Sequence, residues 1–253
     1  YYDIVMQYGA TSKKAEELTQ REYRLASSRV AGLIHASPDE IAFMPNGSMG
    51  ISMIAFSLPW KKGQNVIVDE MSFISNAAPW IQIRDQYGVD IRYAPAKLPG
   101  FIDCQAIEDL IDHNTVLIAA THSANSLGVV QDVEEIGRIA RKNGIRYLVD
   151  ASGTLGATDI DVDKIQCDYL AAAGRKYLRG PSGSGILYIR KSRQRELKDV
   201  FRLGIAVSGI IRKEHSPIMK TFRNGIMEKK IIRPYLDCRR PSGIWKKLEE
   251  RHM

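Results

Sequence analysis

The 253-residue chain has the composition of an ordinary globular protein, with 44% hydrophobic and 26% charged residues. This length allows one large domain, or a large domain with a small second one. No apolar run approaches a membrane span and no secretory signal opens the chain, so we expect neither a membrane protein nor a secreted one. The three cysteines, Cys104, Cys167 and Cys238, match no metal-ligand spacing, which predicts no metal site and a reducing, cytoplasmic location.

The formal net charge of +7 is concentrated at the carboxyl end of the chain. Residues 190–253 hold 18 Lys and Arg against 7 Asp and Glu, whereas residues 1–189 hold 18 against 22. A basic segment can bind nucleic acid. This one lacks the aromatic interleaving, zinc ligands or recognition-helix pattern of a dedicated module, so we expect a solvated or partner-covered surface instead.

Hydrophobic periodicity predicts helices and strands in alternation. Residues 12–35 carry apolar side chains at helical spacing and are predicted to form an amphipathic helix. The predicted strands are 41–44, 65–68, 90–94, 115–120, 145–149, 168–174 and 185–190, and the other predicted helices are 49–58, 103–112 and 133–143. The alternation between Ile41 and Leu170 predicts an α/β fold with a mostly parallel central sheet covered by helices on both faces.

An aspartate and a lysine stand at the ends of two predicted strands. Asp150 ends the apolar run 145–149, and Lys176 follows a run of small residues 26 positions later. Pyridoxal phosphate needs an amine that holds it as a Schiff base and a carboxylate that keeps its ring nitrogen protonated. Ligands of open α/β sheets bind outside the carboxyl ends of the strands, where both residues are predicted to lie. The pair therefore predicts a pyridoxal phosphate site.

A second candidate site lies in the segment Pro45-Asn46-Gly47-Ser48, where a strand gives way to an apolar helix. Free backbone N–H groups and the positive end of the helix dipole at this point suit an anion. A plain helix cap is an equally good interpretation of these residues alone.

The lysine segment, Gly174-Arg175-Lys176-Tyr177-Leu178-Arg179-Gly180-Pro181, is followed by a glycine-rich turn and the strand 185–190. This stretch resembles the class V aminotransferase superfamily of pyridoxal phosphate enzymes, which includes cysteine desulfurases, selenocysteine lyases and isopenicillin N epimerases. The resemblance implies a fold-type-I large domain over residues 1–200, an amino-acid substrate and a homodimer. It fades at about Phe201, so residues 201–253 are predicted to be a divergent basic segment, the remnant of a small domain.

The resemblance also implies roles for further residues. Gly47 and Ser48 correspond to the segment that holds the cofactor phosphate, Phe73 to the residue that stacks on the pyridine ring, and Asn125 to the asparagine that binds the cofactor's 3-oxygen. Arg175 stands where many members have histidine, and its guanidinium could pair with phosphate. Thus the cofactor-binding set is Gly47, Ser48, Phe73, Asn125, Asp150, Arg175 and Lys176, with Lys176 and Asp150 catalytic.

Three differences from the family pattern affect the predicted site. Gly153 replaces a frequent glutamine and Ala173 a frequent serine, which removes one bond to the 3-oxygen and one possible phosphate donor. Phe73 cannot move a proton, whereas desulfurases usually have histidine there. His122, just after a predicted strand, is interpreted as a structural hydrogen-bonding residue rather than an acid or base.

The favoured function is therefore a carbon-sulfur lyase-like or epimerase-like enzyme in which Lys176 moves the substrate's α-proton. Two alternatives remain. The first is a cysteine desulfurase or a class V aminotransferase, and the second is a non-catalytic binding or scaffold subunit. A nicotinamide-dependent dehydrogenase is excluded because no Gly-x-Gly-x-x-Gly follows the first strand. Within residues 201–253, Cys238 is not interpreted as the nucleophilic cysteine of a desulfurase, and no arginine is singled out to bind the substrate carboxylate.

Overall fold

The computed structural model describes residues 2–198 and residue 200. The predicted segment 201–253, with Cys238 and its arginines, lies outside these residues. In chain order the elements are α1 Tyr2–Tyr8, α2 Lys13–Leu33, η1 Pro38–Glu40, β1 Ile41–Met44, α3 Gly47–Ser57, β2 Asn65–Asp69, η2 Ile74–Asn76, α4 Ala78–Tyr87, β3 Asp90–Ala94, β4 Ala96–Lys97, β5 Phe101–Ile102, α5 Cys104–Leu110, β6 Thr115–Thr121, α6 Val133–Lys142, β7 Arg146–Asp150, α7 Val162–Ile165, β8 Tyr169–Ala173, β9 Gly185–Ile189 and η3 Lys191–Arg193, where η marks a 3-10 helix.

The main sheet has seven strands in the order β1-β9-β8-β7-β6-β2-β3. The pairs from β8 to β3 are parallel, while β9 is antiparallel to both β8 and β1. Hence β9 alone runs against the others, and β1 points the same way as β8. The predicted mostly parallel sheet is confirmed, and the carboxyl ends of six strands meet at one edge.

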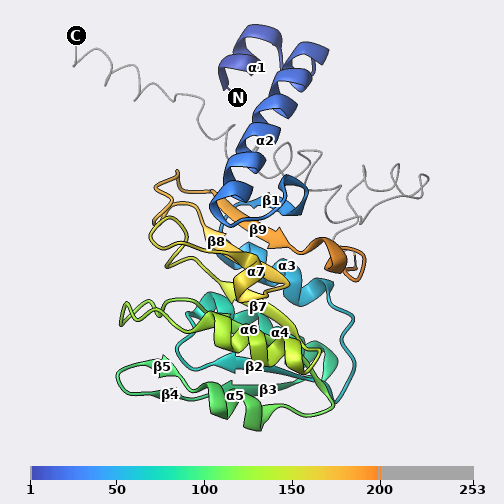
Figure 1. Cartoon of the computed structure of the whole chain (residues 1–253). Coiled ribbons are helices and arrows are strands. Elements are labelled where there is room, and N and C mark those ends of the chain that lie inside the picture. Colours follow the sequence, from blue (N-terminus) through green and yellow to red (C-terminus); the bar gives the residue numbers. More distant parts are fainter. Residues whose placement is uncertain (1, 199, 201–253) are drawn as a thin grey trace, which may run out of the picture. The chain divides into compact units, whose positions relative to one another are not determined.

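Helices cover both faces of this sheet, as predicted (Figure 1). In that view α5, α6 and α7 lie in front of the strands, and α3 and α4 lie behind them. The front core joins Ile136 and Ile139 of α6 to Tyr147 and Val149 of β7. Behind the sheet, Trp80 of α4 is fully buried. Each large apolar side chain buried in this way stabilises the fold by about 1.5–3 kcal/mol.

The predicted strands all form, within one or two residues of their expected ends. Helix α4 was not predicted: Pro79 lies in its first turn, and Gly88 ends it in the left-handed conformation with φ 67°. The short elements α1, α7 and the β4–β5 hairpin were not predicted either. Pieces of two to seven residues are too short to establish a period in the sequence.

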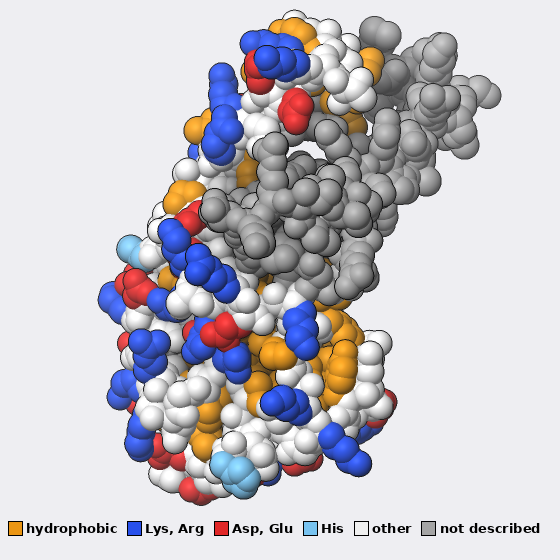
Figure 2. All heavy atoms as spheres, turned by 90° about the vertical axis from the view of Figure 1, so that its right-hand side faces the viewer, with side chains coloured by type: hydrophobic (Ala, Val, Ile, Leu, Met, Phe, Trp, Pro, Cys, Tyr) orange, Lys and Arg blue, Asp and Glu red, His pale blue; other side chains and the backbone are white. Residues whose placement is uncertain are grey.

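The edge where the parallel strands begin faces the viewer in Figure 2. Lysine and arginine side chains are spread over the visible part of this edge, with acidic side chains among them. Ion pairs connect residues at this edge: Arg193 Nε lies 2.9 Å from Asp168 Oδ1, and Arg193 and Arg146 both contact Glu196. None of the helices in residues 2–198 combines the length and apolar character that a bilayer crossing requires.

Candidate functional site

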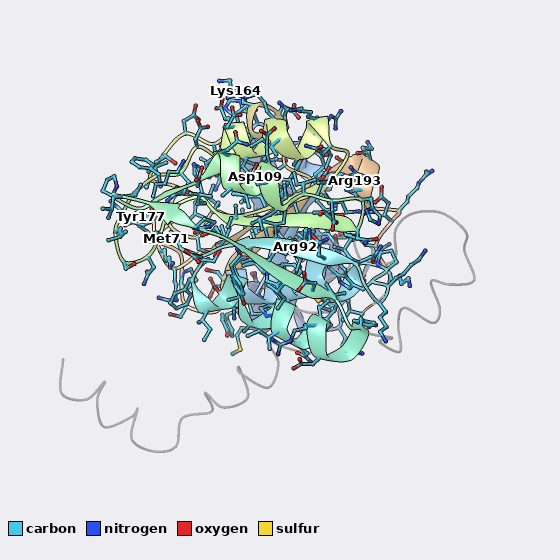
Figure 3. The ribbon with its side chains drawn as sticks, turned by 90° about the horizontal axis from the view of Figure 1, so that it is seen from below. Met71, Arg92, Asp109, Lys164, Tyr177 and Arg193 are labelled. Atoms are coloured by element: carbon cyan, nitrogen blue, oxygen red, sulfur yellow. The ribbon has the colours of Figure 1, made fainter. Side chains whose placement is uncertain are left out.

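The opposite edge of the sheet brings the predicted site residues together. It lies on the left in Figure 1, where β1, β2, β6, β7 and β8 end and the loops after them begin. Figure 3 shows Met71 and Tyr177 at this end of the sheet and Arg193 at the other. Met71 belongs to the loop that carries Phe73, and Tyr177 follows Lys176. Loops from distant parts of the chain therefore meet outside the carboxyl ends of the strands, where open α/β sheets bind their ligands.

Asp150 is the last residue of β7 and is only 4% exposed. Its backbone pairs with Thr121 at the end of β6, and its carbonyl accepts a hydrogen bond from His122 N at 2.9 Å. Its Oδ1 accepts one from Ser152 N at 2.9 Å. In the part of the chain that the structure describes, no donor reaches Oδ2. A buried carboxylate with one oxygen fixed and the other unused is suited to hold a protonated ring nitrogen.

Lys176 lies in the loop between β8 and β9. Two backbone bonds close this loop at its base: Gly174 N donates to Ser184 O, and Gly180 N donates to Gly174 O, each at 2.8 Å. The Lys176 ammonium lies 6.0 Å from the centroid of the Phe73 ring. Among residues 2–198 it forms no ion pair. The amine is therefore held at the site without a competing acidic partner.

Phe73 is 48% exposed and lies in a loop fixed by a polar chain. Asn76 donates to Ser72 Oγ at 2.8 Å, and Ser72 donates to Asp69 Oδ2 at 2.6 Å. The same carboxylate oxygen accepts Thr121 N at 2.7 Å. Burial raises the pKa of Asp69 to about 6, although these hydrogen bonds oppose the shift. Asp69 thereby ties the Phe73 loop to the end of β6.

The start of α3 forms the candidate anion site. Asn46 caps this helix by accepting a hydrogen bond from Met49 N at 2.8 Å. The N–H groups of Gly47 and Ser48 belong to the first turn and have no partner inside the helix. Gly47 is buried and Ser48 is exposed. Because α3 packs against β8, its first turn lies beside the Lys176 loop.

The start of β9 lies very close to the residue that precedes α3. A Cβ atom on Gly185 would lie 2.6 Å from the carbonyl carbon of Asn46. Any other residue at the start of β9 would therefore push the α3 N-terminus away from the sheet. Arg175, which lies between Gly174 and Lys176, is exposed and forms no ion pair within the described residues.

The loop after β6 contains Asn125, which is exposed, and His122, which is not. His122 is 5% exposed, and its Nδ1 lies 2.9 Å from Thr154 Oγ1. Burial lowers the pKa of His122 to about 4, so its ring is neutral at neutral pH. This geometry agrees with the structural role predicted for His122. A Cβ on Gly153 would lie 3.2 Å from Ser123 O, so little space is left there for a glutamine side chain.

Two polar residues at this edge were not singled out in the sequence. Asp69 ends β2 just as Asp150 ends β7, and that position after an apolar strand was the available signal. Ser152 follows Asp150 by two residues; its hydroxyl accepts Ala173 N at 3.1 Å, a contact across 21 positions that no local pattern reveals.

The model of the family described as aminotransferase class-V matches residues 1–222. The chain belongs to the aminotransferase class-V family. A probable cysteine desulfurase of Methanothermobacter thermautotrophicus is 43% identical over 178 residues, which are 70% of this chain and 44% of the relative. A probable cysteine desulfurase of Pyrococcus abyssi is 32% identical over 78% of this chain and 49% of the relative. The chain spans about half the length of the curated relatives it matches.

Solved structures of a cysteine desulfurase and of other proteins share the fold. The apo cysteine desulfurase from Thermococcus onnurineus NA1 matches with a TM-score of 0.72 and 28% identity, over 77% of this chain and 49% of that one. SspA in complex with cysteine matches with a TM-score of 0.71 and 27% identity, over 87% and 64%. A C-DES variant with glycine covalently linked to its PLP cofactor, at 22% identity and a TM-score of 0.75 over 79% and 54%, resembles the chain in fold alone. The fold-type-I architecture predicted from the sequence is confirmed.

Proposed function

We propose that the chain is the cofactor-binding part of a pyridoxal 5′-phosphate enzyme that acts on the carbon-sulfur bond of cysteine or a similar amino acid. One observation carries this proposal. The buried carboxylate of Asp150 stands at the same sheet edge where the unpaired amine of Lys176 faces Phe73. The family match and the desulfurase relatives support the substrate class.

The residues present fit the cofactor. Pyridoxal phosphate, when bound, supplies an electron sink for bonds to the substrate's α-carbon. The free Oδ2 of Asp150 would accept the ring N–H, and Phe73 would pack against the ring face. The N–H groups of Gly47 and Ser48 and the guanidinium of Arg175 would hold the phosphate. Asn125 would donate to the 3-oxygen.

Lys176 has two roles in this proposal. Its amine would hold the cofactor, and when free it would take the substrate's α-proton and return it. The absence of an acidic partner among the described residues matters for the second role, because an ion pair would hold the amine protonated. His122 is a poor candidate for the same work, since it is buried and burial lowers its pKa to about 4.

The fate of the sulfur separates two candidate functions. A desulfurase passes sulfur to a protein thiol, whereas a lyase releases it on a small molecule. Cys167 is fully buried and Cys104 half-buried, and burial raises the pKa of both thiols. Neither suits a sulfur acceptor. The relatives favour the desulfurase, which was an alternative on the sequence, whereas Phe73 favours a lyase-like or epimerase-like enzyme.

The remaining assignments rest on the family resemblance. We propose that residues 1–200 form the cofactor-binding domain, that residues 201–253 are a divergent addition, and that the protein acts as a homodimer in the cytoplasm. Light scattering coupled to size exclusion measures the dimer directly. A mass of one chain at working concentration would contradict it.

The decisive experiment is a titration of the purified protein with pyridoxal phosphate, followed by borohydride reduction and peptide mass mapping. A visible absorption band and a reduced cofactor mass on Lys176 are expected, and Lys176→Ala should lose both. Release of sulfide, alanine or a cysteine-derived persulfide from cysteine and cystine then identifies the reaction. A cofactor that never attaches would leave the non-catalytic scaffold as the better proposal.

A further inference from the structure

Ser152 lies between the two parts of the candidate site. It follows Asp150 in the turn after β7 and is 9% exposed. Its backbone N donates to Asp150 Oδ1, while its side-chain oxygen accepts Ala173 N from the end of β8 at 3.1 Å. The backbone of Ser152 thus binds the Asp150 carboxylate, and its side chain contacts the end of β8, the strand that precedes the Lys176 loop.

The hydroxyl proton of Ser152 is left without a protein acceptor in the described part of the chain. In the bond with Ala173 the hydroxyl accepts, so its own O–H remains available. A serine hydroxyl carries one donor besides its two acceptor lone pairs, and the bond with Ala173 N uses only an acceptor. A donor oriented into a ligand site therefore indicates an acceptor on the ligand.

The position of Gly47 shows where this hydroxyl lies. A Cβ atom on Gly47 would be 2.7 Å from Ser152 Oγ and 3.1 Å from Ala173 N. The hydroxyl is thus in contact with the first residue of α3, beside the free N–H groups of Gly47 and Ser48. Three donors, two from the backbone and one from Ser152, gather at the positive end of the helix. The neighbouring Ala173 has no hydroxyl to contribute.

We propose that the Ser152 hydroxyl donates a hydrogen bond to the 5′-phosphate of pyridoxal phosphate, and that residue 47 is glycine because this hydroxyl occupies the space of a side chain. The inference rests on the proposed function, since it assigns one more ligand to the same cofactor. In this proposal the hydroxyl of Ser152 contacts the phosphate and no other part of the cofactor. Its loss should spare the interactions of Lys176 and Asp150 with the ring.

The test compares pyridoxal phosphate with pyridoxal, which has the same ring and aldehyde but no phosphate. Both are titrated into wild type, Ser152→Ala and Ser57→Ala by visible absorbance. A hydrogen bond to a charged group corresponds to roughly 10- to 100-fold in affinity, so Ser152→Ala should weaken pyridoxal phosphate binding by that factor and leave pyridoxal unchanged. Ser57 is a fully buried serine at the far end of α3 whose Oγ has no partner within the described chain. Its alanine variant should change neither affinity.

Each other outcome contradicts the inference. Equal losses for both ligands would show that Ser152 only supports the turn, and unchanged affinities would remove it from the phosphate site. Wild type that binds neither ligand would overturn the proposed function as well, which distinguishes that failure from the other two.

Gly47→Ala gives a second measurement if the Ser152 variant does not fold. Its new methyl should displace the hydroxyl and weaken pyridoxal phosphate but not pyridoxal. In a folded double variant, Gly47→Ala should weaken pyridoxal phosphate less in the Ser152→Ala background than in wild type. Equal weakening in both backgrounds, or a loss shared by pyridoxal, would overturn the link between the two residues.

Discussion

The two edges of the sheet use charged residues in opposite ways. At the edge where the parallel strands begin, Arg193 pairs with the buried Asp168 and with Glu196, and Arg146 pairs with Glu196. At the carboxyl edge, Asp150 has a carboxylate oxygen without a donor, and Lys176 has no acidic partner among the described residues. One edge has its charges satisfied within the protein and the other keeps them available.

This difference separates structural charges from those of a ligand site. A buried charge is costly unless something pairs with it. Where the parallel strands begin, ion pairs within the protein offset the free-energy cost of burying charges, and these pairs contribute to the stability of the fold. Where the strands end, the cost is left for a ligand to offset, as in sites that bind charged cofactors. Exchanging an aspartate at each edge therefore tests the comparison directly.

Asp150→Asn should have the largest effect on activity. The amide oxygen can still accept Ser152 N, so the fold is expected to persist, but a neutral side chain no longer keeps the cofactor's ring nitrogen protonated. Turnover should fall by roughly a hundredfold or more. Steady-state kinetics on the cofactor-loaded protein measure this loss, with the melting temperature as the check on folding. Full activity would remove Asp150 from the mechanism.

The matched variant at the paired edge is Asp168→Ala. Asp168 accepts Arg193 Nε at 2.9 Å through Oδ1 and Tyr147 N at 3.0 Å through Oδ2. Its loss leaves the Nε–H of Arg193 and the buried N–H of Tyr147 without their acceptor, although Arg193 keeps its contact with Glu196, and it should lower the free energy of unfolding by about 3 kcal/mol. Urea unfolding measures the change. Turnover per folded molecule should stay the same; a specific loss of turnover would contradict the division between the edges.

The sequence predicted the sheet well because buried strands are short apolar runs between turn residues. It also placed Asp150 and Lys176 at the ends of two strands, since each follows such a run, and their catalytic roles stay a prediction. The direction of β9 and the contact between Ser152 and Ala173 could not be predicted in this way. Both depend on which strands become neighbours, and a one-dimensional pattern does not contain that information.

Asp69 and His122 give a prediction about pH. Burial raises the pKa of Asp69 from 3.8 to about 6 and lowers that of His122 from 6.5 to about 4. Between pH 4 and 6 the folded protein keeps a proton on Asp69 that the unfolded chain releases, so this group's contribution to stability falls as pH rises, by up to about 3 kcal/mol. His122 acts in the opposite direction, because the unfolded chain holds its proton there. The two contributions should largely cancel.

Asp69→Asn should remove one side of this balance. The variant's free energy of unfolding should then rise with pH between 4 and 6.5, while wild type stays nearly flat with respect to these two groups. Urea unfolding at pH 4.5 and 7 compares the two slopes. Parallel profiles for wild type and variant would show that Asp69 keeps an ordinary pKa in the folded protein.

The smallest expected effect concerns the ring of Phe73. Phe73 and Phe101 are almost equally exposed, at 48% and 47%, but only Phe73 faces the Lys176 amine. Packing of an aromatic ring on a flat ligand is favourable by about 0.5–1.5 kcal/mol, so Phe73→Ala should weaken pyridoxal phosphate binding by roughly 2- to 10-fold. Phe101→Ala removes the same amount of exposed ring away from the amine and should leave affinity unchanged. If both variants lost affinity equally, ring contact at Phe73 would not be the cause; exposed aromatic surface at this edge would then serve contacts other than the cofactor.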